Sequence, residues 1–149
     1  MLFRSVSQSR YTLIFMRYED EIDKVSERLS ISGKSGAEAQ KEQTAWPIYY
    51  GVRKAELGKL LKYMDARQED IRSQLYRRLN EKHSRSLGER QIDKYINSEV
   101  EYLRFHELYL EVQELYDKYA AIMDAFDRRG FALRDWTALT VEKLQDVII

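Results

Sequence analysis

Hydrophobic residues in the middle of the chain recur three, four or seven positions apart, which is the repeat of a helix with one narrow apolar seam. Gln68 fills the one gap in this seam. The pattern predicts a long helix that begins near Ile48 and ends at residues 84–88, with Pro47 interrupting or starting a helix. The seam consists of Leu57, Leu61, Met64, Ile71, Leu75 and Leu79.

A second long seam follows in the C-terminal half of the chain. Ser86 and Glu89 match a capping box, in which each side chain bonds a free backbone N–H of the other residue, so a helix should begin there. Two arginines and then Gly130 predict that this helix ends at Arg129, with the glycine just after its last turn. The seam consists of Leu108, Val112, Leu115, Tyr119, Ile122 and Phe126.

Shorter elements are expected near the two ends. Residues 16–29 have helical composition with acids early, where the helix dipole favours them, and residues 30–36 (SISGKSG) are typical of a loop. Ser35 and Glu38 match another capping box. A short amphipathic helix over residues 135–147 is expected to bury Trp136, Leu139 and Leu144.

These elements predict an all-α fold, in which two long helices form an elongated hairpin with short N- and C-terminal helices. An unbroken helix over residues 89–129 would be about 60 Å long, whereas a compact globule of this chain length is only about 40 Å across. Two narrow seams bury little surface, so we expect other copies of the chain to complete the core.

The first fifteen residues differ in composition from the rest. They contain two Arg, three Ser and no acid, which is typical of an organelle presequence, a flexible extension or an upstream start before Met16. We expect residues 1–15 to be dispensable and residues 16–149 to form a single domain.

Charge is strongly segregated along the chain, although 25 basic and 25 acidic residues give a net charge of zero. Residues 1–18 carry +3, residues 19–47 carry −3, residues 48–90 carry +5 and residues 91–149 carry −5. A basic middle and an acidic C-terminal half are compatible with a polyanionic partner despite the neutral total.

The sequence lacks the residues that most enzyme classes require. The absence of cysteine removes disulfides, thiol nucleophiles and zinc–thiolate sites. Neither His83 nor His106 has a Glu three positions before it, as helical di-metal sites require, and no glycine-rich phosphate-binding loop is present. We therefore expect a non-enzymatic protein with no catalytic residue, metal or cofactor.

Basic and aromatic residues are interleaved at the end of the first long helix. Single-stranded nucleic acid is bound by cations that follow its phosphates and by aromatic rings that stack on its bases. This segment is therefore a candidate DNA-binding site, and the alternative is a solvated basic face that balances the acidic helix. The candidate residues are Arg72, Tyr76, Arg77, Arg78, Lys82 and Arg85.

Four tyrosines recur at intervals of seven, at Tyr95, Tyr102, Tyr109 and Tyr116. They could form a stacking ladder for bases, but the same helix carries many acids that would repel phosphates. We interpret the tyrosines as a packing ridge between helices or subunits.

Two segments resemble the UvsY recombination mediators of tailed phages. The first is Met16-Arg17 followed by Tyr18-Glu19-Asp20, and the second is the stretch DAFDRRGFAL over residues 124–133. Trp46, just ahead of the basic helix, also fits. The resemblance covers roughly residues 16–145.

The resemblance implies a protein of the host cytoplasm that binds single-stranded DNA as a ring-like homo-oligomer of about six or seven subunits. It implies that the protein helps a phage recombinase to replace the single-strand binding protein. DNA binding would lie in the basic part, residues 48–88, with Arg72, Arg77 and Arg78 as candidate contacts. Assembly would lie in the acidic part, residues 89–147, through the second seam.

The alternative function is a helical scaffold or assembly chaperone that makes protein–protein contacts only. No stretch of the sequence approaches the 18 apolar residues of a membrane span, so no membrane partner is expected.

Overall fold

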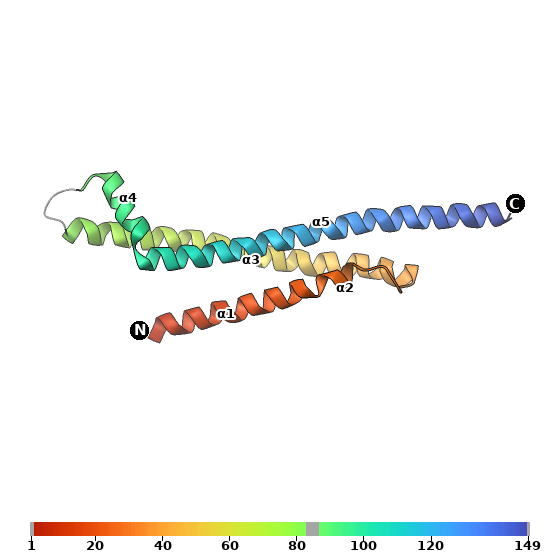
Figure 1. Ribbon diagram of the computed structural model, residues 1–149, viewed down its shortest axis with the longest axis horizontal. Helices are drawn as coiled ribbons and strands as arrows, with labels where there is room; N and C mark the ends of the chain where they lie inside the picture. The colour runs from red at the N-terminus through yellow and green to blue at the C-terminus, as the bar shows by residue number, and fades with distance from the viewer. Residues whose placement is uncertain (1, 83–86, 149) are drawn as a thin grey trace. The chain divides into compact units, whose positions relative to one another are not determined.

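The computed structural model describes the backbone of residues 2–82 and 87–148 and the side chains of residues 13–82 and 87–147. Over these ranges it contains helices and no strand, which confirms the predicted all-α class (Figure 1). No helix among the described residues is long and apolar enough to cross a membrane. The helices are α1 (Leu2–Asp23), α2 (Val25–Leu29), α3 (Gly36–Lys82), α4 (Glu89–Ser98) and α5 (Val100–Ile148).

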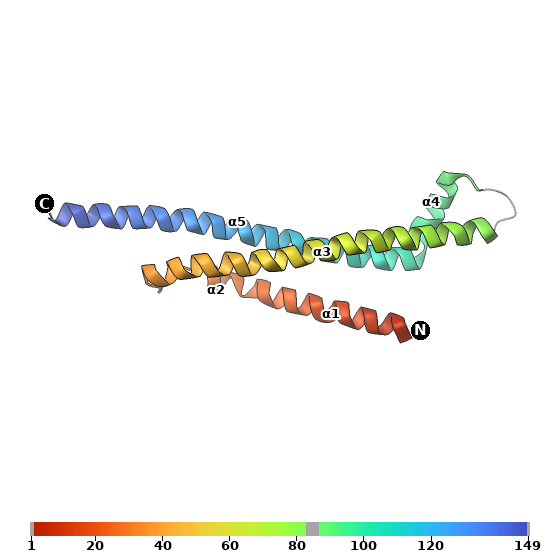
Figure 2. The ribbon, with the colours of Figure 1, turned by 180° about the vertical axis from the view of Figure 1, so that it is seen from behind.

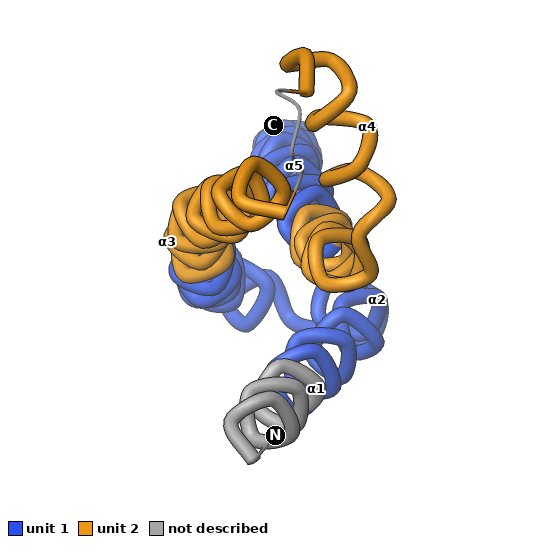
Figure 3. Tube along the Cα trace, turned by 90° about the vertical axis from the view of Figure 1, so that its left-hand side faces the viewer, with its two compact units in different colours: residues 1–55, 115–149 blue, residues 56–114 orange. Residues whose placement is uncertain are grey.

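The chain divides into two compact units (Figure 3). Unit 1 comprises residues 1–55 and 115–149, with α1, α2, the start of α3 and the larger part of α5. Unit 2 comprises residues 56–114, with the rest of α3, all of α4 and the start of α5. Within each unit, α3 and α5 run side by side in opposite directions (Figures 1 and 2).

Helix α3 begins where the sequence predicts. The Glu38 amide donates to Ser35 Oγ at 3.2 Å, and the Ser35 amide donates to Glu38 Oε2 at 3.1 Å, which confirms the capping box. The loop before it contains Gly33, whose φ of +75° lies in the left-handed region that only glycine enters without strain.

Replacing Gly33 with alanine should lower the free energy of unfolding by about 1 kcal/mol, because a Cβ is disfavoured at this positive φ. A Cβ at this position meets no other atom within 4 Å, so backbone strain is the only cost. Gly33→Asn is the matched control, since asparagine enters the left-handed region more readily than alanine does. Urea denaturation compares the two variants, and equal stabilities would contradict the expectation.

Pro47 neither starts nor interrupts a helix, contrary to the expectation, but lies inside α3. A proline removes one backbone N–H and normally breaks a helix interior. Here the capping box at Ser35 starts the helix upstream of the proline, and Ala39 and Tyr50, on either side of it, are fully buried. Tertiary packing on both sides therefore holds the helix through Pro47.

The seam predicted on α3 is confirmed. Four of its residues are buried, namely Leu57, Met64, Ile71 and Leu75, and Leu61, Gln68 and Leu79 are half-buried. The amide nitrogen of Gln68 lies 3.0 Å from Tyr102 Oη and 2.9 Å from His106 Nδ1, both on α5. A polar layer of Gln68, Tyr102 and His106 thus interrupts the apolar seam of unit 2.

The tyrosine ridge packs only in part as predicted. Tyr102 and Tyr109 are half-buried, and their rings lie on either side of the His106 ring at centroid distances of 6.0 and 6.3 Å. Burial raises the pKa of Tyr109, and the neighbouring Asp65 of α3 raises it further, so this tyrosine packs against α3. Tyr95 differs, because 48% of it is exposed.

The second long helix is broken, contrary to the prediction of one helix over residues 89–129. Helix α4 ends at Ser98, Glu99 is extended with ψ of 130°, and α5 then begins at Val100. Asn97 and Ser98 are weak helix formers, and Ser98 Oγ donates to the Tyr95 carbonyl at 2.9 Å. The break lets Ile92 and Ile96 of α4 pack against Ile71 and Leu75 of α3.

The start of α4 agrees with the predicted position, but its cap is a different residue. The N-cap is Gly88, without a side-chain hydrogen bond, and Glu89 is the first helical residue. Ser86, the predicted N-cap, lies outside the described residues.

Gly130 does not end a helix, contrary to the prediction, and α5 continues through it to Ile148. The reason is close packing rather than capping. A Cβ on Gly130 would lie 2.9 Å from Gln43 Nε2, which donates to the Phe126 carbonyl at 2.8 Å. Glycine therefore allows α3 and α5 to approach each other at this point in unit 1.

Arg129 is the central polar residue of unit 1, with 5% of it exposed. Its Nε donates to the Leu29 carbonyl at 3.1 Å, and its Nη1 donates to the Ala39 carbonyl at 3.2 Å and to Gln43 Oε1 at 3.0 Å. Its Nη2 lies 3.2 Å from Glu42 Oε2. One guanidinium thus joins the end of α2, the start of α3 and α5.

The C-terminal residues are exposed, which corrects the prediction that they form a separate helix with a buried side. Trp136, Leu139 and Leu144 are 49%, 55% and 59% exposed. Trp136 lies beside Gly36, the first residue of α3, where a Cβ would be 3.2 Å from the indole ring. Helix α5 therefore extends past the start of α3, and no described residue buries its last turns.

The seam predicted on α5 contributes to the core of the single chain. Its residues Val112, Leu115, Tyr119, Ile122 and Phe126 are buried, and Leu108 is half-buried. In unit 1 the centre of the Tyr50 ring lies 5.9 Å from the centre of the Tyr119 ring and 5.5 Å from that of the Phe126 ring. The role of these residues in self-association stays a prediction.

The N-terminal helix is longer than expected. Helix α1 begins at Leu2 rather than near Met16, and the chain turns at Lys24 before α2. Tyr119 Oη donates to the Tyr18 carbonyl at 3.1 Å, and Arg28 lies 4.0 Å above the Trp46 ring, so α1 and α2 both contact the rest of unit 1. The dispensability of residues 1–15 for function stays a prediction.

Candidate nucleic-acid interface

The predicted DNA-binding residues do not share one face of α3. Successive residues of an α-helix are turned by about 100°, because it has about 3.6 residues per turn. Relative to the buried seam, Arg72 and Tyr76 lie on one flank and Arg78 lies on the other. Arg77 lies on the outer face, opposite the seam, and Lys82 is the last residue of the helix.

Arg72 is engaged within unit 2. Its Nη2 lies 2.7 Å from Asp93 Oδ1, and its Nη1 donates to Asn97 Oδ1 at 3.4 Å. Burial alone would lower the pKa of Arg72, but the hydrogen bond to Asp93, the charge of Asp93 and the neighbouring Tyr102 together outweigh it, so the pKa is raised. Arg72 thus ties α3 to α4, which makes it a structural residue rather than a free phosphate ligand.

Arg72→Gln should therefore lower stability, by about 0.5–1 kcal/mol because the pair is partly exposed, and should leave the affinity for single-stranded DNA nearly unchanged. Arg77→Gln should weaken binding to single-stranded DNA and leave stability nearly unchanged, because Arg77 is exposed. Thermal melting and fluorescence anisotropy with an oligo(dT) probe measure the two properties. A loss of DNA affinity in the stable fraction of Arg72→Gln would refute the structural assignment.

The other described candidates are available to a ligand. Arg77, Arg78 and Lys82 are exposed and form no hydrogen bond or ion pair with any residue that the structure describes. Tyr76 is 41% exposed. Arg85, like His83, lies outside the described residues.

Further basic residues on the outer face of α3 are absent from the prediction. Lys59 precedes Arg77 by 18 residues, which is five helical turns, so both point away from the seam. Lys62 and Tyr63 lie close to the same line, and Tyr63 is 64% exposed. A projection of the whole helix reveals these residues, whereas a search for dense charge clusters does not.

Helix α4 adds two exposed cations that the prediction also omits. Arg90 and Lys94 are one turn apart on the side of α4 opposite Ile92 and Ile96, which are buried. The described end of unit 2 thus carries exposed positive charge on both α3 and α4.

Among the described residues, no group of three or more His, Asp or Glu side chains is placed to hold a metal ion. Comparison with known proteins gives no family model, no curated protein and no solved structure that matches this chain.

Proposed function

We propose that this protein binds single-stranded DNA through unit 2 and acts as a recombination mediator. The observation that carries the proposal is the set of exposed cations on α3 with no ion-pair partner among the described residues, which form two groups, each next to an exposed tyrosine. The cations are Lys59, Lys62, Arg77, Arg78 and Lys82, and the tyrosines are Tyr63 and Tyr76.

This arrangement suits a flexible strand better than a duplex. Tyr63 and Tyr76 are 13 residues apart on one helix, or about 20 Å at 1.5 Å per residue. A single strand can turn its bases toward such rings while its phosphates contact the lysines before Tyr63 and the cations after Tyr76. Stacking tolerates any base, so most of this affinity is independent of sequence.

Assembly of several copies would strengthen binding, because each subunit offers few contacts and linked sites act at a high effective concentration. The exposed end of α5 provides a surface for it. Leu144 and Val147 continue, at helical spacing, the buried line of Phe126 and Leu133. The recombinase and the single-strand binding protein enter as partners through the resemblance to the UvsY mediators.

A salt titration of the binding of a fluorescent oligo(dT) strand tests the DNA-binding proposal. Each phosphate contact on a single strand contributes about −0.7 to the slope of log affinity against log salt, so three to five contacts predict a slope of about −2 to −3.5. Absence of binding at low salt, or binding that is independent of salt, would contradict the proposal.

A helical scaffold without nucleic acid is the second candidate, and the exposed apolar end of α5 favours it. The same titration separates the two functions. A scaffold would self-associate in light scattering but would leave oligo(dT) unbound at every salt concentration.

A further inference from the structure

The contact between α3 and α4 in unit 2 is formed on the flank of α3 that carries an exposed tyrosine. Arg72 Nη2 of α3 lies 2.7 Å from Asp93 Oδ1 of α4, so α4 meets α3 on the flank of Arg72. Tyr76 lies on the same flank, one helical turn further along α3. The helices are also held together, independently of the ion pair, by the apolar cluster of Ile71, Leu75, Ile92 and Ile96.

Tyr76 of α3 and Arg90 of α4 lie on the same side of this ion pair. Tyr76 follows Arg72 by four residues, which is one helical turn. Arg90 precedes Asp93 by three residues, which is also one turn. Tyr76 is close to the end of α3 and Arg90 is the second residue of α4, so both turns lead toward the connection between the two helices. The tyrosine and the arginine therefore border one corner of unit 2.

The side chains at this corner are available to a ligand. Tyr76 is 41% exposed. Arg90 and Lys94, one turn apart on α4, are exposed and have no ion-pair partner among the residues that the structure describes. The carboxylate of Asp93, which lies between them in the sequence, is paired with Arg72 instead. The corner thus offers two unpaired cations and one aromatic ring, on two helices that are packed together.

A nucleotide with an unpaired base matches these groups. An aromatic ring stacks on any base, and cations bind the phosphates next to it. An arginine suits a phosphate because its planar guanidinium donates two parallel hydrogen bonds. A base within a duplex is paired and stacked on both faces, so it has to leave the helix before a protein ring can stack on it. Such a corner therefore favours a single strand.

We infer that the corner of Tyr76, Arg90 and Lys94 binds one unpaired nucleotide, with its base on the tyrosine and its phosphate on the two cations of α4. This contact rests on the proposed function, because it belongs to the same strand-binding unit. It adds a means of selection. Cations on the outer face of α3, such as Arg77, can bind the phosphates of either a single strand or a duplex, whereas the corner requires an unpaired base.

The test measures the affinity of the full-length protein for a fluorescent 20-nucleotide oligo(dT) strand and for the same strand paired with oligo(dA), by anisotropy at fixed salt. The wild type should prefer the single strand. Tyr76→Leu should weaken binding to the single strand at least about fivefold, which is the lower end of the contribution of one stacked base, and should leave binding to the duplex unchanged. Tyr76→Phe should behave as the wild type, because stacking does not require the hydroxyl group.

Arg90→Gln tests the phosphate contact separately. It should make the slope of log affinity against log salt shallower by about 0.7 for the single strand and leave the slope for the duplex unchanged. Arg90 is exposed, so this variant should keep the fold even if Tyr76→Leu disturbs the packing of unit 2, which circular dichroism of each variant checks.

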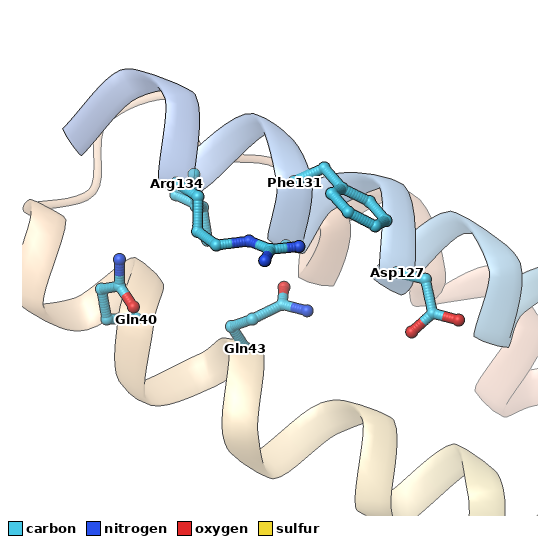
Figure 4. A pocket seen from close by; sticks show the side chains of 7 residues that line it. Gln40, Gln43, Asp127, Phe131 and Arg134 are labelled. Atoms are coloured by element: carbon cyan, nitrogen blue, oxygen red, sulfur yellow. The ribbon is translucent and has the colours of Figure 1, made fainter. Parts of the chain in front are cut away.

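An aromatic residue and an arginine in unit 1 provide the matched control. Figure 4 shows Phe131 and Arg134 on α5, where the guanidinium carbon of Arg134 lies 4.4 Å from the centre of the Phe131 ring. Phe131 is 60% exposed. Phe131→Leu and Arg134→Gln remove the same kinds of group and should leave both affinities unchanged. If they reduce the preference for the single strand as much as the unit 2 variants do, the corner has no special role.

The double variant Tyr76→Leu/Arg90→Gln tests whether the two residues bind the same nucleotide. Its loss of affinity should be smaller than the product of the two single losses, because either substitution already loosens the shared nucleotide. A loss equal to that product would show two separate contacts and overturn the shared site.

The remaining outcomes separate this site from the proposed function. Failure of the wild type to bind either DNA contradicts the proposed function itself. Equal affinity of the wild type for the single strand and the duplex overturns the selection by the corner and leaves strand binding intact. A preference for the single strand that survives Tyr76→Leu, or a salt slope that survives Arg90→Gln, overturns the corner in the same way.

Discussion

Arg129→Met should lower the free energy of unfolding by about 3 kcal/mol or more, which is a large part of the stability of a domain of this size. The substitution keeps the volume and the helix propensity of the side chain but removes every donor. The carbonyls of Leu29 and Ala39 and the Oε1 atom of Gln43 then lose the hydrogen bonds that Arg129 donates, in a buried or partly buried environment. Glu42 loses its bond to Arg129 as well, while Lys34 remains 2.7 Å from it.

Urea denaturation monitored by circular dichroism measures this loss. Arg128→Met is the matched control, since Arg128 is the adjacent residue and is exposed, and it should change stability by no more than about 0.5 kcal/mol. Equal stabilities of the two variants would show that the hydrogen bonds of Arg129 are dispensable.

Replacing Arg77, Arg78 and Lys82 together with alanine should strongly weaken binding to single-stranded DNA. The three side chains are exposed and make no contact in the buried seam of α3. Alanine is a strong helix former, so the fold should persist. If each cation neutralises one phosphate, the slope of log affinity against log salt should become shallower by about 2. Anisotropy over a salt series, with circular dichroism of the same samples, provides both measurements.

The matched control removes the same charge from unit 1, by replacing Lys41, Arg128 and Lys143 with alanine; all three are exposed. A general effect of net charge would weaken both triple variants alike. If DNA binds to an interface on unit 2, only the triple variant of unit 2 should bind DNA more weakly. Wild-type affinity and salt slope in the folded unit 2 variant would place the DNA-binding surface elsewhere and favour the scaffold.

Local patterns in the sequence predicted much of the fold. The seam from Leu57 to Leu79 and the capping box of Ser35 and Glu38 were predictable because each depends on residues within a few turns of each other. The all-α class follows from the same patterns. Helix ends were less predictable where a distant residue decides the outcome.

Gly130 and Arg72 illustrate that difference. Gly130 has the position of a helix-terminating glycine, but Gln43, far away in the chain, makes it a packing glycine. Arg72 has the position of a phosphate ligand, but Asp93 of α4 pairs with it. The exposure of Lys59, Lys62 and Tyr63 becomes clear only once the buried face of α3 is known.

The polar layer of Gln68, Tyr102 and His106 restricts how α3 and α5 can align in unit 2. A purely aliphatic seam repeats every seven residues, so two such helices could slide by one repeat and pack almost equally well. A slip here would move Gln68 away from its partners and leave a polar amide among apolar side chains, at a cost of about 1–3 kcal/mol. One glutamine therefore selects a single register for the pair, and with it the positions of the exposed cations on α3.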